Sequence, residues 1–387
     1  MISARTVLRH VPRTYWIILG GTFTNNFGNF VLPFLFVYAV RDGVPASLAG
    51  LPVAGYGAGA VIASILGGVL TDRWGCRLTI IVSMVASACA MFSLAVVHPP
   101  ALLVLTATMA GLFANLYRPA VGALVADLAT TANRATMYAA YRSAMNLGMA
   151  VGVGLAGLLA DHAFLLLFIG DAVSSLVFAC LAIWGLPADH GRAHARPTPG
   201  MRVGVRHDRP FLLFLLASTV VWLVYYQLYF GLPLRVGQLG YPNHVLGLLI
   251  SFSAALVLVA ELPVTYRTQS WPREPAIAAG ALLVGLGFAL LGPAHSWWTL
   301  GLCVVVFTAG EVLIAPLGAA YVMDVSPDRA HGRYQGAWNL TRSIGMLSAS
   351  SLGGLAVAVA PWLLWVCCAA GGLLSCVAVL VVAQLRR

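Results

Sequence analysis

Long apolar stretches alternate with short polar breaks along the whole chain, and this alternation limits what the chain can fold into. A membrane-spanning helix requires about 20 apolar residues. Charged residues make up only 9% of the 387 residues, whereas soluble domains carry about 25%. So few charges cannot cover a water-exposed surface. The sequence therefore predicts an all-α membrane protein and excludes a soluble enzyme.

Twelve spans are predicted, in two groups of six. The first group covers 15–40, 46–70, 78–97, 101–125, 136–159 and 163–186. The second group covers 210–236, 244–266, 275–293, 297–322, 334–357 and 361–384. A polar stretch that is rich in arginine and proline separates them. We expect a six-helix bundle over 1–186, a linker over 187–209 and a second bundle over 210–387.

The arginines indicate an orientation. The chain has 22 arginines, no lysine and a net charge of +10. If the N-terminus is cytoplasmic, 17 arginines fall on the cytoplasmic side, 2 on the far side and 3 within spans. Membrane proteins retain basic residues on the cytoplasmic side. We expect both termini and the linker to be cytoplasmic, in the inner (plasma) membrane. Because the cytoplasmic placement of the arginines accounts for the net positive charge, we expect no nucleic-acid partner.

The two halves of the sequence repeat one another. A shift of 197 residues places 119–157 on 316–354 without a gap. The matched pairs include Pro119 with Pro316, Asp127 with Asp324, Gly148 with Gly345, and Gly157 with Gly354. A shift of 200 places Phe30-Val31-Leu32-Pro33 on Phe230-Gly231-Leu232-Pro233. Parallel repeats related by an axis along the membrane normal are typical of transporters.

The break between spans 2 and 3 carries a motif. Gly68, Asp72, Arg73, Gly75 and Arg77 have the spacing G-x-x-x-D-R-x-G-x-R. This motif resembles a signature of the Major Facilitator Superfamily. The resemblance implies a twelve-helix transporter whose halves rock about a central site, with this loop acting as a cytoplasmic gate. The alternative is an ordinary basic loop.

Further segments resemble the drug/proton antiporter branch of that superfamily. One contains Gly310-Glu311, Pro316 and Arg333-Tyr334-Gln335-Gly336; another is Gly148-x3-Gly152-Val153-x3-Gly157. Val153 stands where that branch usually has proline, and the arginine that many proton-coupled members carry near Ala107 is absent. The acidic residue that many exporters carry in span 1 is also absent from this sequence.

Charged residues within spans are the candidates for proton coupling, since each costs about 2.5–3.5 kcal/mol at the membrane centre unless it is paired or hydrated. Glu311 is the leading candidate, Arg342 lies at a similar depth, and Asp171 is the second acid. Glu261 can reach the interface and pair with Arg267. The alternative for all of them is a set of structural ion pairs between helices.

One face of span 7 is aromatic, and the matching face of span 1 is polar. Residues at i, i+3, i+4 and i+7 share a helix face. The predicted substrate-binding residues are Asn25, Asn26, Asn29, Arg118, Trp222, Tyr225, Tyr226 and Tyr229. A polar face opposite an aromatic face suits an amphiphilic guest. Ordinary helix packing is the alternative.

These features favour a secondary active transporter, not an enzyme, that exports small hydrophobic or amphiphilic compounds in exchange for protons. A proton-coupled importer and a dedicated metabolite or peptide exporter remain alternatives. The expected partners are a small-molecule substrate, protons and the lipid bilayer, and the chain is expected to be a monomer. An intramembrane enzyme would require a zinc motif or paired catalytic aspartates, and no H-E-x-x-H sequence occurs. We expect no metal and no cofactor.

Overall fold

The structure is a computed structural model. It describes residues 12–46, 48–97, 99–128, 134–187, 208–268, 271–327 and 331–386. Helices account for nearly all of these residues, and no strand occurs among them. Most of the predicted linker, together with the first eleven residues, lies outside the described part of the chain.

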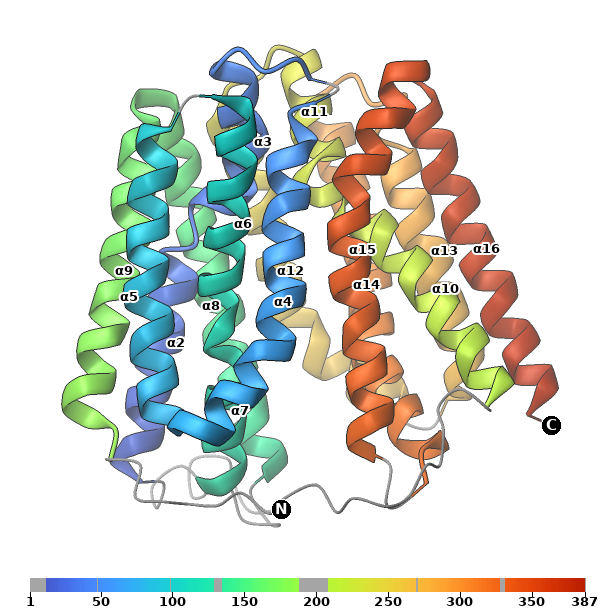
Figure 1. The fold of residues 1–387 in the computed structure, drawn as a ribbon. Coiled ribbons are helices and arrows are strands. Elements are labelled where there is room, and N and C mark those ends of the chain that lie inside the picture. Colours follow the sequence, from blue (N-terminus) through green and yellow to red (C-terminus); the bar gives the residue numbers. More distant parts are fainter. Residues whose placement is uncertain are drawn as a thin grey trace.

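The N-terminal half consists of helices that run between the two ends of the molecule (Figure 1). They are α2 (Arg13–Phe27), α3 (Val31–Arg41), α4 (Gly50–Trp74), α5 (Cys76–Val96), α6 (Pro100–Leu116), α7 (Arg118–Leu128), α8 (Arg134–His162) and α9 (Phe164–Gly185). The start of α2 and the end of α16 lie at the same end of the molecule, which we call the lower end after Figure 1.

The C-terminal half also consists of helices that run between the two ends (Figure 1). Its elements are α10 (Arg209–Tyr225), the 3-10 helix η2 (Tyr226–Tyr229), α11 (Gly231–Gln238), α12 (Asn243–Thr268), α13 (Arg273–Ala289), α14 (Trp297–Val325), α15 (His331–Val359) and α16 (Leu363–Leu385). Helices α3 and α11 both lie at the upper end (Figure 1).

Prolines explain why three predicted spans are interrupted. A proline has no N–H group and clashes with the carbonyl four residues before it, but it fits the first turn of a helix. Pro33 lies in the first turn of α3, Pro233 in that of α11 and Pro119 in that of α7. Each interruption directly precedes one of these prolines. The predicted spans 15–40, 101–125 and 210–236 are therefore not single uninterrupted helices.

Ten segments of the described chain are long and apolar enough to cross a membrane. The pair α2 and α3 falls outside this set because each member is short, and α13 has only 17 residues. Exposed tryptophans mark both ends of the molecule: Trp74 and Trp184 at the lower end, Trp298 and Trp362 at the upper end. Tryptophan is enriched at membrane–water interfaces, so this pattern fits a multi-pass membrane protein.

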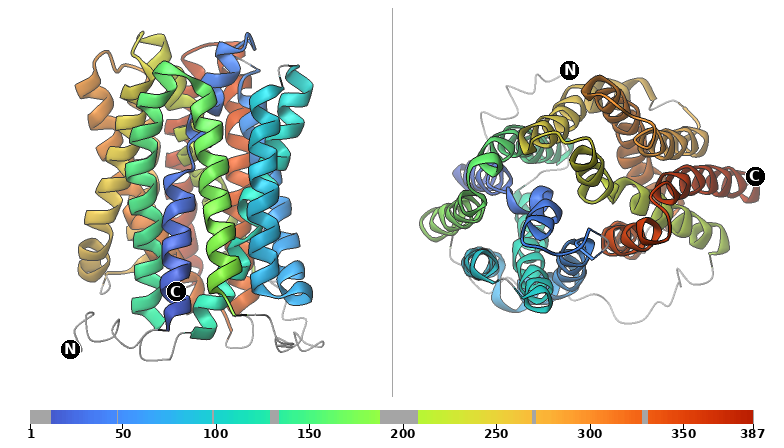
Figure 2. Two further views of the ribbon diagram at one scale, coloured as in Figure 1. Left: turned by 90° about the vertical axis from the view of Figure 1, so that its left-hand side faces the viewer. Right: turned by 90° about the horizontal axis from the view of Figure 1, so that it is seen from above.

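The two halves meet along two helix pairs, α4 with α15 and α8 with α12 (Figure 2). Glycines permit the closest approach, since they have no Cβ atom. A Cβ added at Gly57 of α4 would lie 2.9 Å from backbone atoms of Leu347 in α15. A Cβ added at Gly247 of α12 would lie 2.8 Å from the Val153 carbonyl oxygen of α8. From this contact α4 and α15 diverge toward the lower end (Figure 1).

Candidate functional site

The aromatic cluster of span 7 lies where that span changes from α10 to η2. Ring centroids are 5.4 Å apart for Trp222 and Tyr225, 5.5 Å for Tyr225 and Tyr226, and 6.1 Å for Tyr226 and Tyr229. The four rings therefore form one continuous cluster, although the helix tightens to 3-10 geometry within it. Tyr225 and Tyr226 retain accessible surface, whereas Trp222 is 2% exposed and Tyr229 is 7% exposed.

Trp222 packs against α15. The Arg342 guanidinium carbon lies 4.4 Å from its ring centroid, and a Cβ added at Gly345 would lie 2.7 Å from its own Cβ. A cation over an indole face is attracted by the ring quadrupole. Trp222 therefore supports Arg342 and offers little surface to a guest, in contrast to its predicted place in the binding face.

Glu311 and Arg342 face the tyrosines of the cluster. Glu311, on α14, lies within hydrogen-bonding reach of the Tyr225 hydroxyl. Arg342, on α15, lies within hydrogen-bonding reach of the Tyr226 hydroxyl and close enough to Glu311 for their charges to interact. The acid and the arginine that the sequence places at similar depth are thus brought together, with two phenols beside them.

Glu261 pairs with Arg142 across the two halves. The Arg142 Nη2 to Glu261 Oε1 distance is 2.5 Å, and the side chains are 45% and 15% exposed. Proximity in the sequence favours Arg267, six residues farther along the same helix, as the partner of Glu261. Helix α8 lies against α12 and brings Arg142 nearer, which sequence distance does not reveal.

Asp171 contacts the backbone where span 1 is interrupted, between α2 and α3. Its carboxylate lies on α9, is 3% exposed and faces the backbone N–H groups of Phe30 and Val31. The first N–H groups of a helix lack intrahelical partners and favour a negative charge. A Cβ at Gly28 would collide with Ser174 of α9, so α9 fits closely around this break. The geometry gives Asp171 a structural role at the start of α3.

The three asparagines of span 1 do not share one environment. The Asn25 amide lies 3.4 Å from Ser175 Oγ of α9 and 3.5 Å from Met84 Sδ of α5. The Asn26 amide donates to the Thr22 carbonyl at 2.8 Å, and Asn29 is half-buried at the break. Helix α2 packs on α8 and α9, so part of its polar face is turned into the N-terminal half.

Arg118 is a second cation that the N-terminal half contributes, in addition to Arg142. It is the first residue of α7, and its side chain is exposed. Its nearest electrostatic neighbours are the phenols of Tyr56, Tyr117, Tyr141 and Tyr226. Tyr226 belongs to the other half, so Arg118 lies between the halves. We call Arg118, Tyr225, Tyr226, Glu311 and Arg342 the inter-half site.

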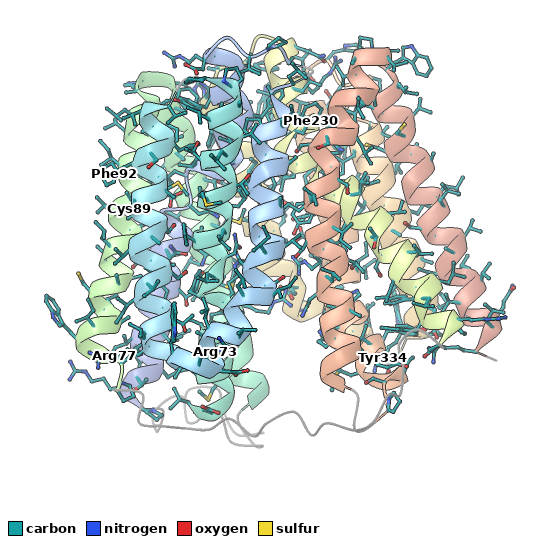
Figure 3. The ribbon with its side chains drawn as sticks, viewed as in Figure 1. Arg73, Arg77, Cys89, Phe92, Phe230 and Tyr334 are labelled. Atoms are coloured by element: carbon teal, nitrogen blue, oxygen red, sulfur yellow. The ribbon has the colours of Figure 1, made fainter. Side chains whose placement is uncertain are left out.

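The loop motif lies at the lower end (Figure 3). Gly75 has φ +84°, a conformation that glycine adopts without strain, and it joins α4 to α5. Asp72 and Arg73 are exposed, Arg77 donates to the Ile183 carbonyl of α9 at 2.5 Å, and a Cβ at Gly68 would meet open space.

The C-terminal half has an ion pair near its corresponding loop, between Arg273 of α13 and Asp324 of α14. Asp324 is the repeat partner of Asp127.

Because Asp72 is exposed in the loop motif, we expect its substitution to change the transport rate and not the stability of the fold. Asp72→Asn removes its charge at nearly constant shape. Because the side chain is exposed, we expect the free energy of unfolding to change by less than about 0.5 kcal/mol. We expect slower transport with substrate affinity retained, since Asp72 is exposed at the lower end and is not one of the residues of the inter-half site. Parallel measurement of equilibrium binding and initial transport rate checks this. An unchanged transport rate, or a loss of substrate affinity that accounts for the slower rate, would show that the loop is not a gate.

Phe230 lies at the contact between the halves, although it is not among the predicted site residues. It is fully buried, and its ring centroid lies 5.0 Å from that of Phe36 on α3 (Figure 3). A Cβ at Gly353 of α15 would lie 2.8 Å from the same ring. Phe230 therefore packs between both halves above the inter-half site. The repeated Phe-x-Leu-Pro segment is the sequence feature from which this position could have been predicted.

Asp161 also connects the halves at the upper end. Its carboxylate accepts hydrogen bonds from the backbone N–H groups of Asn243, at 2.7 Å, and His244, at 3.1 Å, and it contacts the His244 ring nitrogen at 2.7 Å. A carboxylate at a helix N-terminus is stabilising. Asp161 of α8 thus caps α12 across the boundary between the halves.

Metal binding has no support in the described part of the chain, where no group of three or more His, Cys, Asp and Glu side chains could hold an ion. The cysteines of that part form no disulfide bond.

Sequence relatives of the chain are membrane transporters. An uncharacterized MFS-type transporter, YqjV of Bacillus subtilis (strain 168), is 24% identical over 89% of this chain and 86% of its own length. A protein of Planococcus maritimus described as a Na(+), Li(+), K(+)/H(+) antiporter is 24% identical over 86% of each chain. Multidrug resistance protein MdtH of Escherichia coli (strain SE11) is 24% identical over 73% of this chain and 70% of MdtH.

Solved structures share the fold. The nucleoside transporter NupG superimposes with a TM-score of 0.77 at 15% identity, over 96% of this chain and 99% of that one. A peptide transporter POT in complex with sulfate superimposes with a TM-score of 0.78 at 15% identity, over 100% of this chain and 98% of that one. The Major Facilitator Superfamily family model matches residues 18–255 and 236–387. These residues span both halves of the structure, and the chain belongs to the Major Facilitator Superfamily.

Proposed function

We propose that the chain crosses the membrane twelve times, as two six-helix bundles over 1–186 and 210–387 joined by 187–209. Ten segments qualify by length and apolarity; α2 with α3, and α13, supply the remaining two. The pseudo-symmetry is supported by the starts of α3 and α11, at Val31 and Gly231. These starts are 200 residues apart, as the repeat predicts.

We propose that the protein is a secondary active transporter that exports small amphiphilic compounds in exchange for protons. The observation that carries this proposal is the position of Glu311, a carboxylate deep between the halves, beside the Tyr225 phenol and the positive charge of Arg342. A carboxylate in such a place binds or releases a proton when its neighbours move. Asp171, engaged by the start of α3, is the second candidate for the proton site.

Alternating access provides the mechanism. The halves contact one another at the upper end, around Phe230, Gly247 and Asp161, and Arg118 of the inter-half site is exposed. Rocking of one half against the other opens the upper end and closes the lower end. With the lower end cytoplasmic, this structure is the inward-facing state, and proton binding to Glu311 biases the exchange between the states.

A panel of compounds in everted membrane vesicles tests the function. The compounds are anionic, neutral and cationic aromatics, and the imposed gradients are of pH or of sodium and potassium. Export coupled to protons predicts uptake into everted vesicles only when the lumen is acidic. Accumulation with an alkaline lumen would instead indicate the importer alternative. Uptake that follows sodium or potassium alone would assign the coupling to another ion.

Orientation has its own test. His295, in the upper-end turn before α14, and Pro327, at the lower end of α14, are both exposed. In a cysteine-free background of the active protein, His295→Cys is expected to react with an impermeant thiol reagent added to intact cells. Pro327→Cys is expected to react only after the membrane is permeabilised. The opposite labelling pattern would reverse the orientation.

A further inference from the structure

Arg118 is a cation without an acidic partner among the described residues. Its side chain is exposed and lies deep between the halves, and its four nearest electrostatic neighbours are phenols. A charged side chain within a membrane span is costly unless it is paired or hydrated. Because the side chain is exposed, water can reach it, and a ligand that displaces this water must replace the lost interactions.

Each of the neighbouring carboxylates interacts with a group other than Arg118. Glu261 forms its ion pair with Arg142, at 2.5 Å. Asp171 faces the backbone N–H groups that begin α3. Glu311 lies beside Tyr225 and Arg342. The described groups around the inter-half site are thus three arginines, at 118, 142 and 342, against Glu261 and Glu311. One positive charge is left over, and two when Glu311 is protonated.

Tyr226 interacts with both Arg118 and Arg342, which belong to the inter-half site. Its hydroxyl lies within hydrogen-bonding reach of Arg342, and its ring is among the nearest neighbours of Arg118. An arginine only donates hydrogen bonds, so the Tyr226 oxygen accepts from Arg342 and its own proton remains available for another acceptor. Arg118, Tyr226 and Arg342 therefore present donors to the same region from opposite halves.

We propose that the transported compound carries an acidic group, a carboxylate or a sulfonate, which binds between Arg118 and Arg342 and accepts a hydrogen bond from the Tyr226 hydroxyl. Its apolar part lies on the exposed edges of the Tyr225 and Tyr226 rings. Arginine matches a two-oxygen anion with paired donors. Because the two arginines belong to different halves, the bound anion draws the halves together. This inference names the substrate class of the proposed transporter and rests on that function for its transport step only.

Three naphthalene compounds of nearly equal size test the proposal: 2-naphthoate, 2-naphthamide and trimethyl(2-naphthylmethyl)ammonium. Equilibrium dialysis with the purified, full-length protein in detergent measures their binding. Hydrogen bonds to charged groups contribute about 1.5–3 kcal/mol. We therefore expect the naphthoate to bind about 10- to 100-fold more tightly than the naphthamide. Equal or tighter binding of the ammonium compound would overturn the proposal.

Variants locate the site. Arg118→Gln is expected to lower naphthoate affinity to that of the naphthamide and leave naphthamide affinity unchanged, while Arg118→Lys keeps part of the preference. Arg41→Gln is the matched control, because Arg41 lies at the upper end over the Phe164 ring, and it should bind as the parent does. Unchanged naphthoate binding in Arg118→Gln would overturn the proposal. If Arg118→Gln fails to fold, weaker naphthoate binding by Arg118→Lys supports the site and unchanged binding rejects it.

The outcomes also separate this inference from the proposed function. Anion-selective binding without proton-coupled transport would reject the function and keep the site. Proton-coupled transport of neutral or cationic compounds, without a preference for anions, would reject the site and keep the function.

Discussion

Glu311→Gln is expected to abolish transport driven by a pH gradient while leaving exchange of substrate across the membrane intact. Glutamine has the shape of the protonated acid and still hydrogen-bonds to Tyr225, but it cannot release a proton. One pH unit supplies about 1.4 kcal/mol per proton, which supports about tenfold accumulation. We expect this accumulation in vesicles that contain the parent protein and none in Glu311→Gln. Counterflow of labelled substrate against unlabelled substrate should continue.

Asp171→Asn serves as the comparison for that experiment. Because Asp171 faces the start of α3, its loss is expected to reduce stability and the amount of folded protein, with coupling retained in the fraction that folds. Gradient-driven accumulation by Glu311→Gln at the parent level, together with its loss in Asp171→Asn, would transfer the proton site to Asp171.

Gly247→Ala is expected to shift the protein toward the state that is open at the upper end. The added Cβ would lie 2.8 Å from the Val153 carbonyl oxygen and 2.9 Å from the Gly157 Cα atom of α8. Both contacts are with backbone, which cannot move aside as a side chain can. Overpacking of this kind costs about 1–3 kcal/mol, and only the closed arrangement has this contact. The equilibrium should therefore move by about 5- to 150-fold.

Gly301→Ala is the matched control, since a Cβ there would meet open space and the same side chain is gained in a membrane helix. Accessibility of a cysteine at Phe36, beneath the upper-end contact, measures the shift in a cysteine-free background. We expect faster labelling from outside in Gly247→Ala and an unchanged rate in Gly301→Ala. Equal rates in all three proteins would show that the α8–α12 contact does not close the upper end.

The sequence predicts much of the fold because the membrane imposes simple rules. Apolar runs must form helices, since no water is present to pair with backbone groups. The repeat aligns Phe30 with Phe230, and the structure has a helix interruption at each of these residues. Each interruption could be read from Pro33 and Pro233, but the hydropathy of the spans conceals it. The apolarity of a segment indicates that it lies in the membrane, but it does not show whether its helix is continuous.

The site is less predictable because it depends on which helices pack together. Sequence spacing suggests Arg267 as the partner of Glu261, whereas contact between α8 and α12 provides Arg142. A helical face of four aromatics is visible in the sequence, but the burial of Trp222 against Gly345 is not. Asp171 is a charge within a span by sequence, and only the fold shows that it caps α3. Single-residue roles therefore require the three-dimensional contacts.

Proton movement that accompanies substrate movement tests the central claim most directly. A pH-sensitive dye is enclosed in proteoliposomes that contain the purified protein, and a labelled 2-naphthoate gradient is imposed without a pH gradient. Antiport predicts that protons move opposite to the naphthoate, with the dye signal absent in Glu311→Gln while naphthoate still crosses the membrane. Naphthoate flux without proton movement, or with protons moving in the same direction, would contradict proton-coupled export.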